Sequence, residues 1–490
     1  MNLDTRLWNA RALTRRQFFR QSGLSLGAVA LGNLLLARDG FAAGTPGRNV
    51  VNPLTPKKPP FAPRAKSIIY LHMSGAPPSL DLFDWKPKLV ELHLKPCPEE
   101  LLKGQRFAFI KGVPKMLGSP YKFSQRGQNG AWVSETLPHF AGMVDDVAII
   151  KSVWTDQFNH APAELFIYTG SPRAGAASMG SWLTYGLGTE NRDLPGFVVL
   201  LSGGTDPTGG KSLWGSGFLP SVYQGVQCRS AGEPILFASN PAGMDRSSRR
   251  RTLDALDKLD ELEAKQFGDP ETLTRISQYE LAYRMQIAVP EVFDISKEPK
   301  QVHQMYGTRP GEASFANNCL LARRLIEKGV RYVQLYDWGW DIHGTGPGDD
   351  LLNQFPKKCR DVDQACATLI QDLKQRGLLE ETLVIWGGEF GRTPMNEARG
   401  GSLFLGRDHH PHCFTIWMAG GGIKPGLVYG ETDELGYGIV KDKVSVRDLQ
   451  TTILHLMGID AHQLTYRFQG LNQRLIGPAE EGQVVKEILV

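Results

Sequence analysis

Residues 67–73 read SIIYLHM, a run of apolar and β-branched side chains that passes directly into the small and polar stretch SGAPPSLDLFD at 74–84. A short apolar run of this kind is typical of a strand that is buried on both faces, as in a parallel sheet. The same pattern recurs at Val147–Val153, Phe197–Leu201, Tyr332–Tyr336, Thr382–Trp386 and Phe414–Met418. The sequence therefore predicts six buried strands of a parallel sheet.

Amphipathic stretches with helical spacing lie between these runs. They cover residues 253–267, 313–328 and 361–376, and the last is followed by Gly377, a residue that favours the end of a helix. Strands that alternate with helices in this way predict an α/β fold, with a doubly wound, mostly parallel sheet flanked by helices.

The N-terminus has the three parts of an export signal. A basic segment, LTRRQFFR at 13–20, precedes an apolar run at 23–37 and small residues at 40–44. The paired arginines indicate the Tat route, and the apolar run is shorter than the ~20 residues of a membrane-spanning helix. We expect a Tat signal peptide at 1–43, a proline-rich tether at 44–65 and one domain with insertions at 66–490. The mature protein is then periplasmic or otherwise exported, with no membrane span.

Charge is concentrated in the same N-terminal segment. Residues 1–42 carry six arginines and two aspartates, which accounts for the net charge of +4, and the other 448 residues have 49 basic and 49 acidic side chains. A neutral mature chain gives no electrostatic reason to expect a nucleic acid partner. The six cysteines form no C-x-x-C pair, which disfavours a zinc ribbon, and most are expected to be buried thiols.

Metal-type donors follow the predicted strands, where the ligand sites of open α/β sheets lie. The segment RDHHPH at 407–412 holds three of the eleven histidines within four residues, the strongest local chemical signal of the chain. Carboxylate and imidazole donors suit Zn²⁺, Mn²⁺ or Ca²⁺, and Arg392 and Arg407 suit a phosphate or sulfate group. The candidate metal ligands are Asp81, Asp341, His343, Glu389, Asp408, His409, His410 and His412.

Simpler interpretations remain open for several of these positions. Asp81 suits a turn or a helix cap, and His160 suits a hydrogen-bonded loop histidine. Glu389 is compatible with a helix cap that pairs with Arg392. The 408–412 segment is also compatible with a solvent-exposed polar loop.

Several motifs resemble one family of exported proteins. These are GEFGRTP at 388–394, GRDHHP at 406–411, AGGG at 419–422 and GETDE at 430–434, together with the export signal. They are similar to the sulfatase-like domain-of-unknown-function 1501 family, within the alkaline phosphatase and sulfatase superfamily. The resemblance covers about residue 66 to the C-terminus and implies an alkaline phosphatase/sulfatase-like core.

By position, the resemblance also implies roles for individual residues. Asp81 or Asp84 stands at the superfamily's first-strand ligand, His160 at its nucleophile, and Glu389 at its late carboxylate. Asp341 and His343 resemble the mid-chain ligand pair, and His409 or its neighbours the last histidine ligand. The chain departs from the pattern in having no Ser, Thr or Cys at the nucleophile position, and Phe390 where a histidine follows the late carboxylate.

Two functions follow as hypotheses. The first is a metal-dependent hydrolase of phosphate or sulfate esters, of small anionic molecules or of polysaccharides. Arg392 or Arg407 would hold the anionic group, and His160 would be a metal ligand, an acid or base, or a phosphorylated nucleophile. The second is a binding or accessory protein that keeps the fold without turnover, which the missing nucleophile hydroxyl favours.

Overall fold

The computed structural model describes residues 52–490, except 105–106, 236–239, 241–242, 268–269 and 478–481. The predicted signal peptide at 1–43 and the start of the tether at 44–51 lie outside the described residues. The remaining tether residues, 52–65, form turns and extended backbone.

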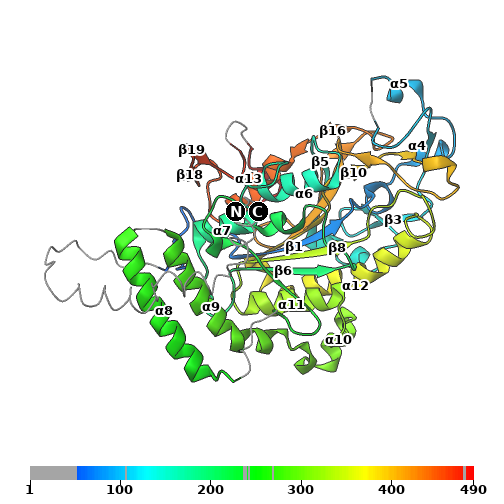
Figure 1. The fold of residues 1–490 in the computed structure, drawn as a ribbon. Helices are drawn as coiled ribbons and strands as arrows, with labels where there is room; N and C mark the ends of the chain where they lie inside the picture. The colour runs from blue at the N-terminus through cyan, green and yellow to red at the C-terminus, as the bar shows by residue number, and fades with distance from the viewer. Residues whose placement is uncertain (1–51, 105–106, 236–239, 241–242, 268–269, 478–481) are drawn as a thin grey trace, which may run out of the picture. The chain divides into compact units, whose positions relative to one another are not determined.

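One mixed sheet carries the fold (Figure 1). Its strands lie in the order β14 (Leu427–Tyr429), β5 (Val147–Trp154), β13 (Phe414–Ala419), β9 (Thr382–Gly387), β1 (Ser67–Ser74), β8 (Tyr332–Trp338), β6 (Phe197–Ser202) and β7 (Val226–Cys228). A ninth strand, β17 (Val444–Ser445), pairs with β5. All six predicted strands are present, and the prediction of a mostly parallel sheet is confirmed.

The strand predicted at 414–418, β13, is, contrary to our expectation, not parallel to its neighbours. It runs antiparallel to both β5 and β9, whereas the other pairs of the sheet are parallel. A parallel neighbour needs a crossover of a dozen or more residues, usually a helix. Residues 388–413 join β9 to β13, all of them are described, and they contain no α-helix. The chain therefore turns back beside β9, and Glu389, Arg392 and the 407–412 segment lie in this return.

Helices cover both faces of the sheet, as a doubly wound fold requires (Figure 1). Alternate side chains of β1 point to opposite faces of the sheet. Ile69 and Leu71 belong to one apolar cluster, and Ile68 and Tyr70 belong to the other. The first cluster contains α11 (Phe315–Glu327) and α12 (Gln354–Gln375); the second contains α6 (His160–Thr169), α7 (Met179–Leu187) and α13 (Val446–Leu456).

The predicted helices are confirmed with shifted boundaries. Residues 253–267 lie inside α8 (Arg246–Phe267), which packs against α9 (Pro270–Phe293). The 361–376 helix begins earlier, because α12 starts at Gln354. Shorter elements are α4 (Pro87–Glu91), α5 (Glu99–Leu102), α10 (Lys300–Tyr306), β2 (Lys115–Met116), β3 (Phe123–Arg126), β4 (Ala131–Ser134), β10 (Gly391–Arg392), β11 (Met395–Asn396), β12 (His409–His410), β15 (Glu431–Thr432), β16 (Ile439–Lys441), β18 (Tyr466–Phe468) and β19 (Leu471–Gln473). Among the described helices, none has the length and apolar character needed to cross a membrane.

The six cysteines are free and buried, as predicted for most of them. Burial raises the pKa of the Cys228 thiol to about 12. A buried thiol with a raised pKa stays protonated at neutral pH and is a poor nucleophile or metal ligand.

Candidate metal centre

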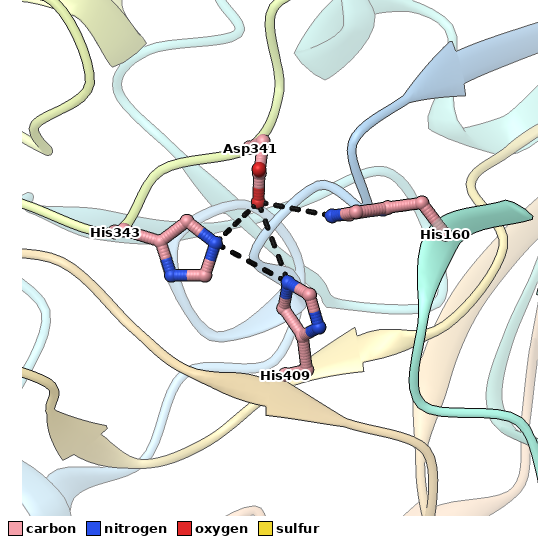
Figure 2. A group of neighbouring side chains, drawn as sticks. All are labelled: His160, Asp341, His343 and His409. Atoms are coloured by element: carbon pink, nitrogen blue, oxygen red, sulfur yellow. Dashed lines mark hydrogen bonds and ion pairs between the residues drawn. The ribbon is translucent and has the colours of Figure 1, made fainter. Parts of the chain in front are cut away.

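Four predicted site residues meet at one point beyond the carboxyl end of the sheet (Figure 2). Asp341 and His343 follow β8, His409 lies in the short β12 strand, and His160 is the first residue of α6. The Asp341 Oδ1 atom lies 2.7 Å from His343 Nε2, 3.2 Å from His160 Nε2 and 3.5 Å from His409 Nε2. The Nε2 atoms of His343 and His409 are 3.2 Å apart. We call these four side chains the Asp341 group.

The other ring nitrogen of each histidine is held by an oxygen. His409 Nδ1 lies 2.7 Å from the Phe158 carbonyl, His160 Nδ1 lies 2.5 Å from Glu389 Oε1, and His343 Nδ1 contacts Glu397 Oε2. A carbonyl or carboxylate oxygen only accepts hydrogen bonds, so each Nδ1 carries the donated hydrogen. Arg399 Nη2 is also near His343 Nδ1, at 3.1 Å, but the closer Glu397 oxygen sets the tautomer.

With Nδ1 as the donor to its oxygen partner, each histidine directs its Nε2 atom at Asp341 Oδ1. A ligating histidine is normally oriented in this way, with its second nitrogen donating to a carboxylate or a carbonyl. The His409 ring is neutral at pH 7, so its Nε2 lone pair faces the Asp341 carboxylate and His343 Nε2, an arrangement that a cation between them would stabilise. The four separations, 2.7 to 3.5 Å, bracket the ~3.3 Å between ligand atoms of a tetrahedral site with bonds of about 2.0–2.1 Å. The Asp341 group therefore fits a divalent cation.

Charge around Asp341 keeps it ionised. Burial raises the pKa of this carboxyl, but Arg392 and the three imidazoles outweigh burial and hold the pKa well below its usual range. Burial lowers the pKa of His409 to about 4, so this ring is neutral at pH 7. For His160, the carboxylates of Asp341 and Glu389 outweigh burial and raise the pKa to about 9. Without a cation, His160 is therefore protonated at neutral pH.

The turn that follows β1 supports Asp341 from behind. Gly75 has φ +108°, and a Cβ atom there would lie 2.4 Å from the Asp341 backbone nitrogen, so this position requires glycine. Arg392 Nη2 donates to the Gly75 carbonyl and to Asp341 Oδ1, both at 2.5 Å, and Arg392 Nε donates to the Ala76 carbonyl. Arg392 thus neutralises Asp341 and fixes the turn.

The structure places the remaining predicted residues outside the Asp341 group. Asp81 and Arg407 are fully buried and form a two-point ion pair at 2.7 and 3.0 Å, and Arg407 also donates to the carbonyls of Leu117 and Thr393. His410 Nε2 lies 2.6 Å from the Tyr437 carbonyl, and the His412 ring contacts His410. The proposed ligand roles of Asp81, His410 and His412, and the anion-binding roles of Arg392 and Arg407, stay predictions.

Asp408 and Glu389 lie next to the Asp341 group. Asp408 Oδ2 accepts the backbone N–H groups of Phe109 and Ile110, at 2.8 and 3.0 Å. Asp408 also forms a possible donor set with Glu397 and His343, on the side of the His343 ring away from Asp341. Glu389 lies behind His160 rather than beside Asp341.

Three residues near the group were not foreseen. Phe109 packs the edge of its ring against His343 and His409, with centroid distances of 5.3 and 5.4 Å, and Arg399 lies 3.8 Å over the Phe109 ring. Glu397, eight residues after Glu389, fixes His343. No sequence signal marks Glu397, Phe109 or Arg399, since their roles arise from tertiary contacts.

A second buried cluster also escaped prediction. His72 of β1 and Glu164 of α6 lie with Glu389 in a group whose donor atoms are all within 4.8 Å of one another. Two signals pointed to this cluster: His72 is a polar residue inside an apolar strand, and Glu164 follows His160 by four positions, on the same helix face. Burial lowers the pKa of His72, but the two carboxylates outweigh burial and raise it to about 9.

Asp341 is the side chain of the group with the largest solvent-exposed fraction. The Asp341 side chain is 29% exposed and that of His160 is 12% exposed, against 6% for His343 and 3% for His409. The exposed Phe109 and Arg399 lie next to His343. Asp341 is therefore the member of the group that solvent reaches most readily.

The family model for a protein of unknown function, DUF1501, matches residues 65–489. This chain belongs to the DUF1501 family. No curated protein sequence matches this DUF1501 protein.

Similar solved structures include three hydrolases with low sequence identity. A sulfatase, PsFucS1 from Pseudoalteromonas sp., is 12% identical, with 86% of this chain and 73% of the sulfatase covered and a TM-score of 0.35. The alkaline phosphatase of the Antarctic bacterium TAB5 is 12% identical, with 80% and 98% covered and a TM-score of 0.30. A phosphonate monoester hydrolase from Silicibacter pomeroyi is 13% identical, with 87% and 76% covered and a TM-score of 0.31.

Proposed function

We propose that this DUF1501 protein is an exported, metal-dependent hydrolase of phosphate or sulfate esters, including esters carried by polysaccharides. The observation that carries the proposal is the Asp341 group itself. Its imidazoles are oriented by their Nδ1 partners, and Asp341 remains open to solvent. The twin-arginine segment at the N-terminus supports export.

Asp341, His343 and His409 would hold the cation. A set with two imidazoles and one carboxylate suits Zn²⁺ or Mn²⁺ better than Ca²⁺, which prefers six to eight oxygen ligands. A bound divalent cation would supply Lewis acidity toward an ester oxygen and would lower the pKa of a water molecule. Catalytic zinc sites use three protein ligands and keep one position open, which leaves His160 available for another role.

His160 would donate a proton to the leaving oxygen of the ester. Its Nδ1 is fixed by Glu389, its buried Nε2 is directed at Asp341 Oδ1, 3.2 Å away, and in the absence of a cation the two carboxylates raise its pKa to about 9. An acid that is hydrogen-bonded to a carboxylate and aimed at the reacting group typically contributes 10²–10⁴-fold to the rate. Arg399, which lies next to His343, would contact the anionic group of the substrate.

The test compares metal content and ester hydrolysis in single variants of the full chain. We expect wild type to bind Zn²⁺ or Mn²⁺ and to release p-nitrophenol from p-nitrophenyl phosphate, p-nitrophenyl sulfate or bis(p-nitrophenyl) phosphate. His409→Gln should lose metal and activity together, whereas His160→Gln should keep the metal and lose about 10²–10⁴-fold in kcat. Glu381→Gln, a change of an exposed glutamate in a surface ion pair with Lys66, is the control.

Two results would contradict the proposal. Loss of metal in His160→Gln would make His160 a fourth ligand instead of the acid. A metal-loaded wild type that hydrolyses none of these esters, nor a sulfated or phosphorylated polysaccharide, would favour the binding or accessory function.

A further inference from the structure

The His72 cluster lies deeper than the Asp341 group and shares Glu389 with the surroundings of His160. His72 comes from β1, Glu164 from the second turn of α6, and Glu389 from the loop after β9. All three side chains are 0% exposed. His72 Nε2 lies 3.3 Å from Glu389 Oε2 and 3.7 Å from Glu164 Oε1.

Each carboxylate in the cluster uses one oxygen and leaves the other free. Glu164 Oε2 accepts hydrogen bonds from the Thr208 hydroxyl at 2.7 Å and from the Gly209 N–H at 2.6 Å. Glu389 Oε1 lies 2.5 Å from His160 Nδ1 and accepts the Gly75 N–H at 3.0 Å. The atoms that face one another, Glu164 Oε1, Glu389 Oε2 and His72 Nε2, are buried and make no hydrogen bond to any described residue.

Two buried carboxylates need positive charge in this position. Burying an uncompensated charge costs several kcal/mol, and aromatic rings surround the site, with Tyr168 and Tyr336 each 5.3 Å from the His72 ring centre. Hydrogen bonds between charged groups are normally about 2.7–2.9 Å long, shorter than the separations here. Separations of 3.3 and 3.7 Å instead resemble those of neighbouring ligand atoms around a cation with bonds of about 2.0–2.2 Å.

We propose that His72 Nε2, Glu164 Oε1 and Glu389 Oε2 bind a second divalent cation, of the Zn²⁺ or Mn²⁺ class, inside the protein. This cation is structural, because its ligands are fully enclosed and no substrate can reach it. It fixes Glu389, which in turn fixes His160 Nδ1, and so it holds α6 against the end of β1. The proposal does not depend on ester hydrolysis, since a binding protein could use the same site.

The alternative occupant is a proton, which would make His72 an imidazolium between two carboxylates. The two occupants predict different metal counts. A second cation gives two metal ions per chain, with one bound by the Asp341 group, whereas a proton gives one.

The experiment measures metal stoichiometry by elemental mass spectrometry in the full chain, purified without chelators and loaded with Zn²⁺. We expect two ions per chain in wild type, one in Glu164→Gln and one in His409→Gln. Glu381→Gln, a change of an exposed glutamate in a surface ion pair with Lys66, should keep two ions. Thermal unfolding of each variant shows whether it is folded.

A measurement on wild type removes any dependence on the folding of Glu164→Gln. Anomalous diffraction at the zinc absorption edge should show a peak between His72, Glu164 and Glu389 and a separate peak at the Asp341 group. A peak at the Asp341 group with none at His72 would overturn this proposal and leave the proposed function standing. A peak at His72 alone would do the reverse.

Discussion

Replacing Glu397 with glutamine tests whether the Asp341 group is a metal site or only a buried ion-pair network. The Glu397 side chain is fully buried, Oε2 contacts His343 Nδ1, and Oε1 contacts Arg399 Nε. Glutamine has nearly the same shape but offers one acceptor and one amide group. The amide group must face either the His343 N–H or the Arg399 guanidinium, and both are donors.

The size of the effect follows from the hydrogen bond that is lost. A hydrogen bond to a charged group contributes about 1.5–3 kcal/mol, and tenfold in affinity corresponds to about 1.4 kcal/mol. If the lost bond is the one that fixes His343, zinc affinity falls about 10–100-fold, the range found when partners of ligating histidines are changed. The ligands themselves stay in place, so the metal stoichiometry at saturating zinc is unchanged.

The assay is competition for zinc against a chromophoric chelator, with Glu381→Gln as the control that removes the same charge from the surface. We expect Glu381→Gln to bind as wild type does. Equal zinc affinity in wild type and Glu397→Gln would mean that Glu397 does not orient a metal ligand, and the metal interpretation of the Asp341 group would lose its main support.

Three further predictions concern other parts of the site. Asp81→Ala leaves the buried Arg407 guanidinium unpaired, so the free energy of unfolding measured in urea should fall by about 3–5 kcal/mol with metal content unchanged; loss of a metal ion would instead support Asp81 as a ligand. Because protonated His160 is the active form, kcat should fall as pH rises through the His160 pKa. This pKa is about 9 without a cation and lower beside one. A pH–rate profile that stays flat to pH 10 would exclude the acid role of His160. The free energy of unfolding of wild type should be lower without the cation than at a free cation concentration 100 times Kd, by about 2.7 kcal/mol per site. Identical unfolding curves with and without chelator would show that no cation binds.

The strands were predictable because burial on both faces leaves an uninterrupted apolar run in the sequence. Helix α6 was not predicted from periodicity, since its residues HAPAELFIYT are mostly buried and its polar residues His160 and Glu164 point into the protein instead of to solvent. An apolar run does not show in which direction a strand runs. The antiparallel direction of β13 was therefore seen only in the structure. Asp341, His343, His160 and His409 were correctly expected to lie close together. Each is near the end of a predicted strand, at the edge of the sheet where ligand sites of such folds lie.

Closeness in the sequence does not bring every histidine of the 407–412 segment to the Asp341 group. His409 and His410 are adjacent in the short strand β12, and successive side chains of a strand point to opposite sides. His409 therefore meets Asp341, whereas His410 meets the Tyr437 carbonyl. His72, Glu164 and Glu397 could not be assigned from spacing, because their partners come from distant elements.

The place of β5 in the sheet has a consequence for synthesis of the chain. In the described residues, every strand that pairs with β5 (β13, β14 and β17) comes from residues 414–445, more than 250 residues later. During translation, β5 is synthesised early and remains unpaired until its partner strands are made. An apolar strand with unpaired backbone groups is prone to aggregation during this time. A chain that ends before residue 414 can never pair this strand, and α6 with His160 follows it directly. Aggregation through β5 is therefore favoured until residues 414–445 have been made, and a chain truncated before them is expected to aggregate.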